Sequence, residues 1–313
     1  MSETSESEFL MSFRWSVEDM PSMAGRTVVI TGANSGIGLE TSRYLAAADA
    51  TVIMACRNRE KAQQAVEDIR NSTKCGELVV SDLDLSSLAS VASFAQNLLS
   101  ITSSVDVLIN NAGVMALDRG VTEDGFETHF GINHLGHFAL TNMVLPLLEK
   151  GGQGRVVTVS SMGHRPGRID LNDPMYERRR YSRWGAYFQS KLANLLFTRE
   201  LDHRLRQGQS STIAVAAHPG TARTELGKLG TSMTNTIMRQ FTPVLVRTGV
   251  EGAISQVRAA VDQNIRGGDF VGPRFHMFGD PVHEIPSRRA RNDADALRLW
   301  NLSRELTQTD MQF

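Results

Sequence analysis

The fold is decided by residues 27–38, which read Thr27-Val28-Val29-Ile30-Thr31-Gly32-Ala33-Asn34-Ser35-Gly36-Ile37-Gly38. The first five are apolar or β-branched, which is typical of a buried strand. A glycine-rich turn follows, and a helical pattern then runs from about Ile37 to Ala48. A strand that passes through a glycine-rich turn into a helix indicates an α/β domain.

The same alternation continues along the chain. We predict further strands at 51–55, 77–80, 105–109, 155–159 and 212–217, with helices at about 59–71, 88–99, 122–149 and 185–206. Continuous apolar strands between helices are typical of a parallel sheet covered on both faces. We therefore predict one doubly wound, Rossmann-type sheet with helices on both faces. No repeat or linker divides it, so the domain spans 25–313 after a polar extension at 1–24.

Composition excludes several classes of protein. The 313 residues are 41% hydrophobic and 21% charged with a net charge of -1, which is ordinary for a soluble globular chain and gives no sign of a nucleic-acid partner. No run of about 18 apolar residues predicts a membrane span. No apolar leader follows the acidic N-terminus, and the two cysteines, Cys56 and Cys75, have no disulfide-like pattern. We expect a cytoplasmic protein with reduced thiols.

Two irregular segments interrupt the alternation. One is polar and basic, at 163–184, and the other is rich in Met, Thr and Leu, at about 221–248. Both follow strand ends, where ligands bind in parallel sheets. We interpret the second as an apolar substrate lid, with a partner interface as the alternative. In the first, the run Arg178 to Arg180 is interpreted as solvated, with contact to an acidic substrate or partner as the alternative.

The glycine turn is suited to phosphate. Glycines let backbone amides approach a pyrophosphate, and the helix that follows adds a favourable dipole. The alternative is a simple turn between strand and helix. The expected contacts are Gly32, Asn34, Ser35, Gly36, Ile37 and Gly38.

The end of the second strand favours NADP(H). Folds selective for NAD place an acid about 20 residues after the glycines, to hold the ribose 2′-hydroxyl. Residues 54–59 contain no acid, and Arg57 offers a charged fork suited to a 2′-phosphate. The alternative is that Arg57 and Arg59 are solvated charges at a helix start. After the third strand, Asp84 and Leu85 are placed to meet the adenine, although Asp84 could equally cap the next helix.

Small and amide side chains end the fourth strand. Asn111, Ala112 and Gly113 would let the backbone approach the cofactor or tie neighbouring strands together. Further along, Tyr187 and Lys191 are four residues apart and share a helical face. An ammonium nearby favours the phenolate and lowers a tyrosine pKa, so the pair is suited to proton transfer. The alternative is a chance pairing on a surface helix.

From Gly25 onward the chain resembles the short-chain dehydrogenase/reductase family. The resemblance rests on the glycine turn, on 110–113, on Ser160-Ser161 after the fifth strand, and on Tyr187 with Lys191. Within the family it is similar to the retinol-dehydrogenase-like branch. That likeness rests on 55–57, 134–138, 181–182, 190–194, 218–221 and 287–290. Relatives in this branch often carry a membrane anchor, and we expect a soluble homologue without one.

The resemblance implies a role for each matching residue. Tyr187 would exchange the proton with the substrate oxygen, and Lys191 would lower its pKa and hold the nicotinamide ribose. Ser161 would hydrogen-bond the substrate oxygen, although only one of the adjacent Ser160 and Ser161 can face the site. Asn133 would hold a water that links Lys191 to solvent. The nicotinamide end is expected at Pro219, Gly220, Thr221 and Thr224.

These expectations define a function. We expect an NADP(H)-dependent oxidoreductase that interconverts a carbonyl and an alcohol on an apolar, small-to-medium substrate. Family members are commonly homodimers or homotetramers. The alternatives are a redox-neutral epimerase or dehydratase, and a non-catalytic NADP(H)-sensing regulator. No metal is expected, because His129, His134 and His137 lack the further ligands that a zinc site needs.

Overall fold

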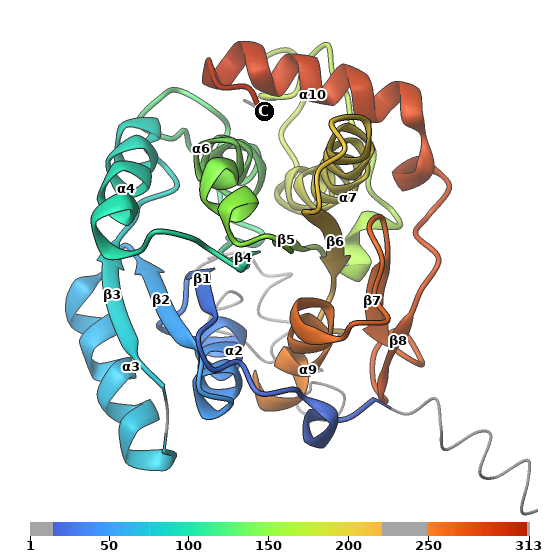
Figure 1. Cartoon of the computed structure of the whole chain (residues 1–313). Coiled ribbons are helices and arrows are strands. Elements are labelled where there is room, and N and C mark those ends of the chain that lie inside the picture. Colours follow the sequence, from blue (N-terminus) through green and yellow to red (C-terminus); the bar gives the residue numbers. More distant parts are fainter. Residues whose placement is uncertain (1–14, 75, 221–248, 312–313) are drawn as a thin grey trace, which may run out of the picture.

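One mixed sheet runs through the centre of the molecule (Figure 1). The computed structural model describes residues 15–74, 76–220 and 249–311. The sheet has eight strands in the order β3-β2-β1-β4-β5-β6-β7-β8, of which the first seven are parallel and β8 is antiparallel. The strands are β1 (Thr27–Thr31), β2 (Thr51–Cys56), β3 (Leu78–Asp82), β4 (Val107–Asn110), β5 (Arg155–Val159), β6 (Ile213–Ala217), β7 (Phe270–Pro273) and β8 (Pro281–His283).

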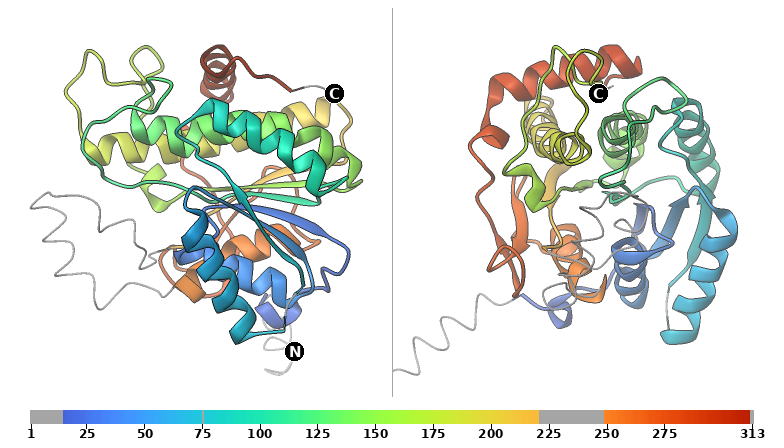
Figure 2. Two further views of the ribbon diagram at one scale, coloured as in Figure 1. Left: turned by 90° about the vertical axis from the view of Figure 1, so that its left-hand side faces the viewer. Right: turned by 180° about the vertical axis from the view of Figure 1, so that it is seen from behind.

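Helices cover both faces of this sheet, which confirms the predicted α/β class (Figure 2). On one face lie α2 (Gly36–Ala47), α3 (Arg59–Ser72) and α9 (Gly249–Val261). On the other lie α4 (Leu88–Ile101), α6 (Gly136–Lys150), α7 (Arg183–Gln207) and α10 (Asp293–Thr307). Shorter turns are η1 (Val17–Asp19), α5 (Thr128–Phe130), η2 (Gly131–Leu135), η3 (Met162–His164) and η6 (Arg289–Arg291).

The strand order reverses between β1 and β4, and ligands of such sheets bind at that reversal. Side chains join the ends of the two strands there. The Thr31 hydroxyl accepts hydrogen bonds from the amides of Asn111 and Ala112, both at 2.9 Å. The Asn111 side chain donates to the Thr31 carbonyl at 2.7 Å. The predicted tie between neighbouring strands at Asn111 is therefore present.

The predicted helix at 122–149 is wrong at its start. Residues 122–127 form a turn instead, closed by a bridge between Val121 and Glu127, with Gly125 at φ +84°. The Glu127 carboxylate then accepts from the amides of His129 and Phe130 and starts the helical stretch. Its second part, η2, is a π-helix, a form that often occurs at functional sites.

Two predicted segments lie partly or wholly outside the described residues. The lid at 221–248 is one, and residues 1–14 of the predicted extension are the other. The rest of that extension packs on the body through Trp15 and Met23, which are 8% and 6% exposed. In the described part of the chain, no helix combines the length and apolar character that crossing a bilayer requires.

Candidate active site

Tyr187 and Lys191 lie on α7, and both are buried against the end of β5. The ammonium of Lys191 donates to the carbonyl of Val159 at 3.0 Å and lies 6.0 Å from the centre of the Tyr187 ring. Burial lowers the pKa of Lys191 to about 8. The pair is therefore part of the buried layer and does not lie on a solvated helix face.

The pKa of Tyr187 is raised, whereas we expected Lys191 to lower it. Burial raises it, and a hydrogen bond with the Ser161 side chain offsets this only in part. The expected effect is missing because the Lys191 ammonium points to the Val159 carbonyl rather than to the phenol oxygen. A raised pKa keeps Tyr187 protonated at neutral pH.

The structure separates the two adjacent serines. The Ser160 hydroxyl donates to the Lys191 carbonyl at 2.7 Å and is 2% exposed, so it fixes β5 to α7. The Ser161 hydroxyl instead accepts from the amide of Gly163 at 3.1 Å and meets the Tyr187 hydroxyl. Of the two candidates, Ser161 is the one beside Tyr187.

Asn133 lies on the π-helix η2 and is fully buried. Its Oδ1 accepts from the amide of Val114 at 2.7 Å, and its Nδ2 donates to the Val114 carbonyl at 3.0 Å and the Ser190 hydroxyl at 2.9 Å. Gly113 lies between Asn133 and Lys191. A Cβ at Gly113 would lie 3.1 Å from Oδ1 of Asn133 and 3.5 Å from Nζ of Lys191. Gly113 thus allows the two side chains to face one space.

The glycine turn has the backbone that a dinucleotide needs. Gly32 and Gly36 have φ values of +64° and +54°, which disfavour any side chain. A Cβ at Gly38 would lie 2.3 Å from the Gly32 carbonyl oxygen and 2.5 Å from Nδ2 of Asn111. Ser35 holds the N-cap position of α2, but its side chain makes no capping hydrogen bond. The first amides of α2 therefore receive no acceptor from Ser35, and the start of this helix suits an anion.

Arg57 follows β2, and its side chain is 72% exposed, with Nε 3.9 Å from the Asp84 carboxylate. Asp84 accepts from the amide and hydroxyl of Ser86 at 2.9 and 2.7 Å. Asp84 therefore closes a turn ahead of α4, whose N-cap is Ser87, so the alternative that Asp84 caps this helix is wrong. Leu85 is buried against Gly136. Arg59 pairs with Asp82 at 3.1 Å, whereas Arg57 lies beside Asp84, one of the residues expected to meet the adenine.

The turn after β6 is also built around a glycine. Gly220 has a φ of +71°, and a Cβ there would lie 2.6 Å from the Met277 carbonyl oxygen. Its amide donates to Nδ1 of His218 at 3.1 Å. Thr221 and Thr224 lie outside the described residues.

His137 joins the site to the strand ends, a role that the sequence did not indicate. Its Nδ1 lies 3.1 Å from the Asn133 carbonyl and its Nε2 lies 2.9 Å from the Thr31 hydroxyl. Burial lowers the pKa of His137 to about 4, so the ring is neutral. Nδ1 then donates to the carbonyl, and Nε2 accepts from Thr31. The position of His137 in a helical motif gave no sign of these partners.

The other two histidines considered as metal ligands also have structural partners. His129 binds Glu127 at 2.8 Å, and His134 binds Ser303 at 2.8 Å. Within 15–74, 76–220 and 249–311, no group of three His, Cys, Asp or Glu residues could hold a metal ion.

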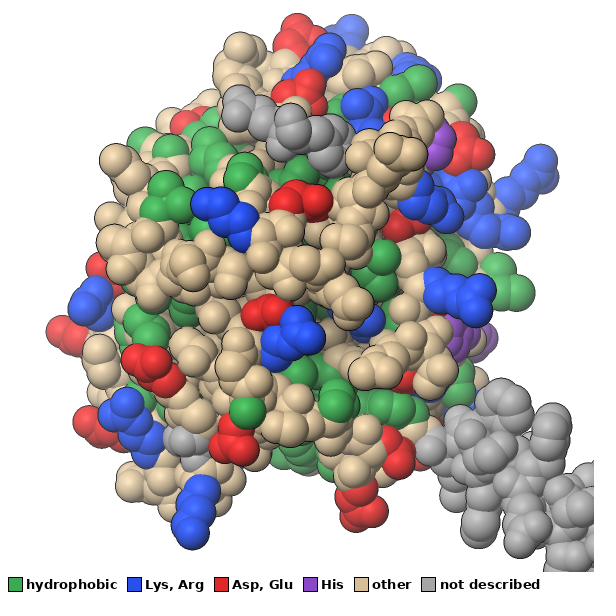
Figure 3. All heavy atoms as spheres, in the orientation of Figure 1, with side chains coloured by type: hydrophobic (Ala, Val, Ile, Leu, Met, Phe, Trp, Pro, Cys, Tyr) green, Lys and Arg blue, Asp and Glu red, His purple; other side chains and the backbone are tan. Residues whose placement is uncertain are grey.

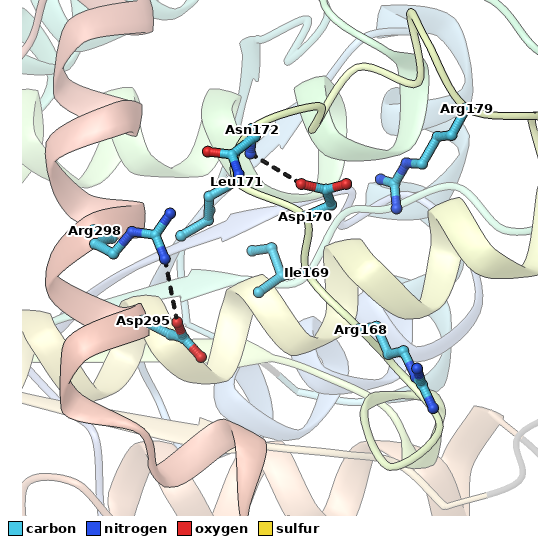
Figure 4. A pocket seen from close by; sticks show the side chains of 8 residues that line it. All are labelled: Arg168, Ile169, Asp170, Leu171, Asn172, Arg179, Asp295 and Arg298. Carbon is cyan, nitrogen blue, oxygen red and sulfur yellow. Dashed lines mark hydrogen bonds and ion pairs between the residues drawn. The ribbon is translucent and has the colours of Figure 1, made fainter.

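The basic insert borders a separate pocket, of about 340 Å³, between residues 168–172 and α10 (Figure 4). Arg179, which lines it, lies 3.7 Å over the Tyr176 ring and donates to Gln189 at 2.5 Å, while Arg178 and Arg180 are exposed. The pocket is lined by Arg168, Ile169, Asp170, Leu171, Asn172, Arg179, Asp295 and Arg298. This lining includes none of Asn133, Ser161, Tyr187 and Lys191, so the pocket is distinct from the candidate active site.

Comparison with known proteins gives a consistent result. The family model for short chain dehydrogenase matches residues 26–234. Retinol dehydrogenase 12 of Homo sapiens is 44% identical over 284 residues, which cover 91% of this chain and 87% of that protein. A crystal structure of a protein from Mycobacterium Paratuberculosis is 47% identical, with a TM-score of 0.81, and covers 96% of this chain and 100% of its own. A chain from Escherichia coli CFT073 complexed with NADPH is 25% identical, with a TM-score of 0.64, over 80% of this chain and 97% of its own.

Proposed function

Because the chain belongs to the short-chain dehydrogenase family of oxidoreductases, we propose that it interconverts a carbonyl and an alcohol with NADP(H). Tyr187 is the general acid and base of this reaction. The observation that carries the proposal is the meeting of Tyr187 with Ser161, beside Lys191 and Asn133, at the ends of β4 and β5. Ser161 and Asn133 come from other elements than α7, which carries Tyr187 and Lys191, so spacing on one helix does not account for the meeting of all four.

Each residue has a task that its contacts support. The Ser161 and Tyr187 hydroxyls lie together, and a substrate oxygen that replaces their mutual hydrogen bond can accept from both, which stabilises developing charge. Tyr187, kept protonated by burial, has the form that donates a proton to a carbonyl. Lys191, whose ammonium donates to the Val159 carbonyl, is proposed to hold the nicotinamide ribose. Oδ1 of Asn133 accepts one hydrogen bond and has a second lone pair for the water that resupplies the proton.

NADP(H) fits the other half of the site. The amides at the start of α2 and the close approach of Gly32 and Gly38 suit a pyrophosphate, and Arg57 suits a 2′-phosphate. Tyr187, Lys191 and the turn at Pro219 and Gly220 would hold the nicotinamide end. The reduced nicotinamide supplies the hydride when it is bound.

The substrate is proposed to be apolar and of small to medium size. Several similar proteins are named retinol dehydrogenases, so retinal and retinol are the first pair to test. Purified protein should consume NADPH in the presence of at least one compound from a panel of aldehydes, ketones, retinoids, steroids and quinones, with an equal amount of alcohol formed. Conversion of a substrate without net NADPH consumption would instead support the epimerase or dehydratase alternative.

A further inference from the structure

A buried histidine and glutamate join β6 to the last strand of the sheet. His218, directly after β6, has a side chain that is 0% exposed, and Glu284, directly after β8, has one that is 3% exposed. Nε2 of His218 lies 2.8 Å from Oε1 of Glu284. A Cβ at Gly272 in β7 would lie 2.0 Å from that nitrogen and 2.4 Å from that oxygen. Strand β7 therefore needs a glycine where this pair crosses it.

The partners of His218 determine which ring nitrogen carries the proton. The Gly220 amide donates to Nδ1 at 3.1 Å, so Nδ1 is an acceptor without a proton. Nε2 must then hold the proton and donate it to Glu284. The opposite tautomer would set an N–H against the Gly220 amide. The Glu284 carboxylate thus favours the one form of His218 that can hold the Gly220 turn.

Glu284 has enough partners to stay ionised at this buried position. Its Oε2 lies 2.8 Å from Nδ1 of His276 and 3.6 Å from the Arg165 guanidinium. Burial raises the pKa of Glu284, but the hydrogen bonds with His218 and His276 outweigh it and leave the pKa below its usual value. His276 is half exposed, and histidine side chains reach the surface on the side where β7 and β8 lie (Figure 3). The network therefore runs from solvent to the turn after β6.

The same C-terminal segment also reaches the serine turn. His164 lies with Nδ1 2.7 Å from the Ser161 carbonyl, and its Nε2 accepts from the amide of Ser287 at 3.2 Å. Glu284 thus reaches the turn after β6 through His218, and Ser287 reaches the turn after β5 through His164. These two turns flank the candidate active site.

We propose that Glu284 is a positioning residue, which acts through His218 to hold the Gly220 turn in the form that binds the nicotinamide end of the cofactor. This inference rests on the proposed function for the identity of the ligand. The hydrogen bonds that join Glu284, His218 and Gly220 can be tested in the protein without a cofactor.

The test uses the full-length protein and three substitutions. Glu284→Met has a similar length but no strong acceptor, and it should raise the dissociation constant of NADPH about tenfold, as expected for the loss of one hydrogen bond to a charged group, with kcat little changed. Glu284→Gln keeps an acceptor for Nε2 and should restore binding to within about twofold of wild type. His283→Gln is the matched control, because His283 lies next to Glu284 but pairs with Asp269 at 3.4 Å.

A double-mutant cycle separates positioning from general stability. In His218→Asn, Oδ1 of the new side chain can accept from the Gly220 amide without Glu284, so adding Glu284→Met should no longer weaken NADPH binding. An equal loss in both backgrounds would overturn the proposal, as would a loss in His283→Gln as large as that in Glu284→Met.

Hydrogen exchange of the Gly220 amide keeps the two proposals distinguishable. If the wild-type protein binds neither NADPH nor NADH, the proposed function fails. Even then, the hydrogen bonds from Glu284 through His218 to Gly220 predict faster exchange of the Gly220 amide in Glu284→Met than in Glu284→Gln. Nitrogen-15 shifts should show Nδ1 of wild-type His218 without a proton. Equal exchange in the two variants, or a protonated Nδ1, would overturn the positioning role.

Discussion

Gly38→Ala should destabilise the protein and weaken NADPH binding, although alanine is the better helix former. Gly38 is the third residue of α2. In an exposed helix this change stabilises by about 1 kcal/mol. Here the added Cβ would lie 2.3 Å from the Gly32 carbonyl oxygen and 2.5 Å from Nδ2 of Asn111, where ordinary contacts begin at 3.4 Å. The packing of the turn therefore reverses the sign of the effect.

The size of the loss in unfolding free energy depends on how far the atoms around the new Cβ must move. Relief of the two contacts requires a shift of roughly 1 Å, and overpacking of this kind costs about 1–3 kcal/mol. The Asn111 side chain is held by its 2.7 Å hydrogen bond to the Thr31 carbonyl, and losing that bond would add about 1 kcal/mol. After the gain in helix propensity, we expect a net loss of about 2 kcal/mol. The displaced start of α2 should also raise the NADPH dissociation constant by about tenfold or more, which equals about 1.4 kcal/mol.

The assays are urea unfolding and NADPH titration by fluorescence. Gly249→Ala is the matched control, because its added Cβ would meet Gly36 at an ordinary 3.4 Å, and the free energy of unfolding should change by less than about 0.5 kcal/mol. Gly38→Ala protein that is as stable as wild type and binds NADPH equally well would refute this account of the glycine turn.

Three further predictions follow from the site. Arg57→Ala should weaken NADPH binding about tenfold and leave NADH binding unchanged, since only a 2′-phosphate uses the guanidinium; equal losses for both cofactors would contradict this. Ser161→Ala should lower kcat about a hundredfold, whereas Ser160→Ala should cost about 1 kcal/mol of unfolding free energy and keep activity, and the reverse pattern would exchange their roles. Acid should destabilise the fold between about pH 6.5 and pH 4. In this range three histidines bind protons in the unfolded chain but stay neutral where they are buried in the folded protein. The free energy of unfolding should then fall by up to about 4 kcal/mol per pH unit. These histidines are His134, His137 and His164, with pKa values lowered by burial to about 3, about 4 and about 4. Urea midpoints that do not change across this range would contradict their buried neutral state.

The sequence predicts the fold as far as β6, because each strand to that point is a local apolar run next to a glycine turn or a helix. The last part of the sheet could not be read in this way. Strand β7 has four residues and ends in Gly272-Pro273, and the antiparallel β8 has three and begins at Pro281. Such short strands are defined by their pairing with β6 and with each other, and local composition does not reveal that pairing.

In the candidate site, too, local features could be predicted from the sequence, whereas features that depend on the folded chain could not. Spacing alone placed Tyr187 and Lys191 on one helix face, and strand geometry required that Ser160 and Ser161 point apart. The direction of the Tyr187 pKa was wrong, because it depends on burial and on where the Lys191 ammonium points, and both are properties of the folded chain. Glu284 gave no signal at all, since its partners come from distant elements.

The role of Tyr187 as proton donor can be measured as the rate of carbonyl reduction by Tyr187→Phe in a single turnover with bound NADPH. The substitution removes one hydroxyl and keeps the ring. We predict a rate at least about a hundredfold below wild type, the usual contribution of a general acid, with the NADPH dissociation constant within about twofold. Reduction at the wild-type rate, with NADPH bound normally, would show that Tyr187 is not the proton donor.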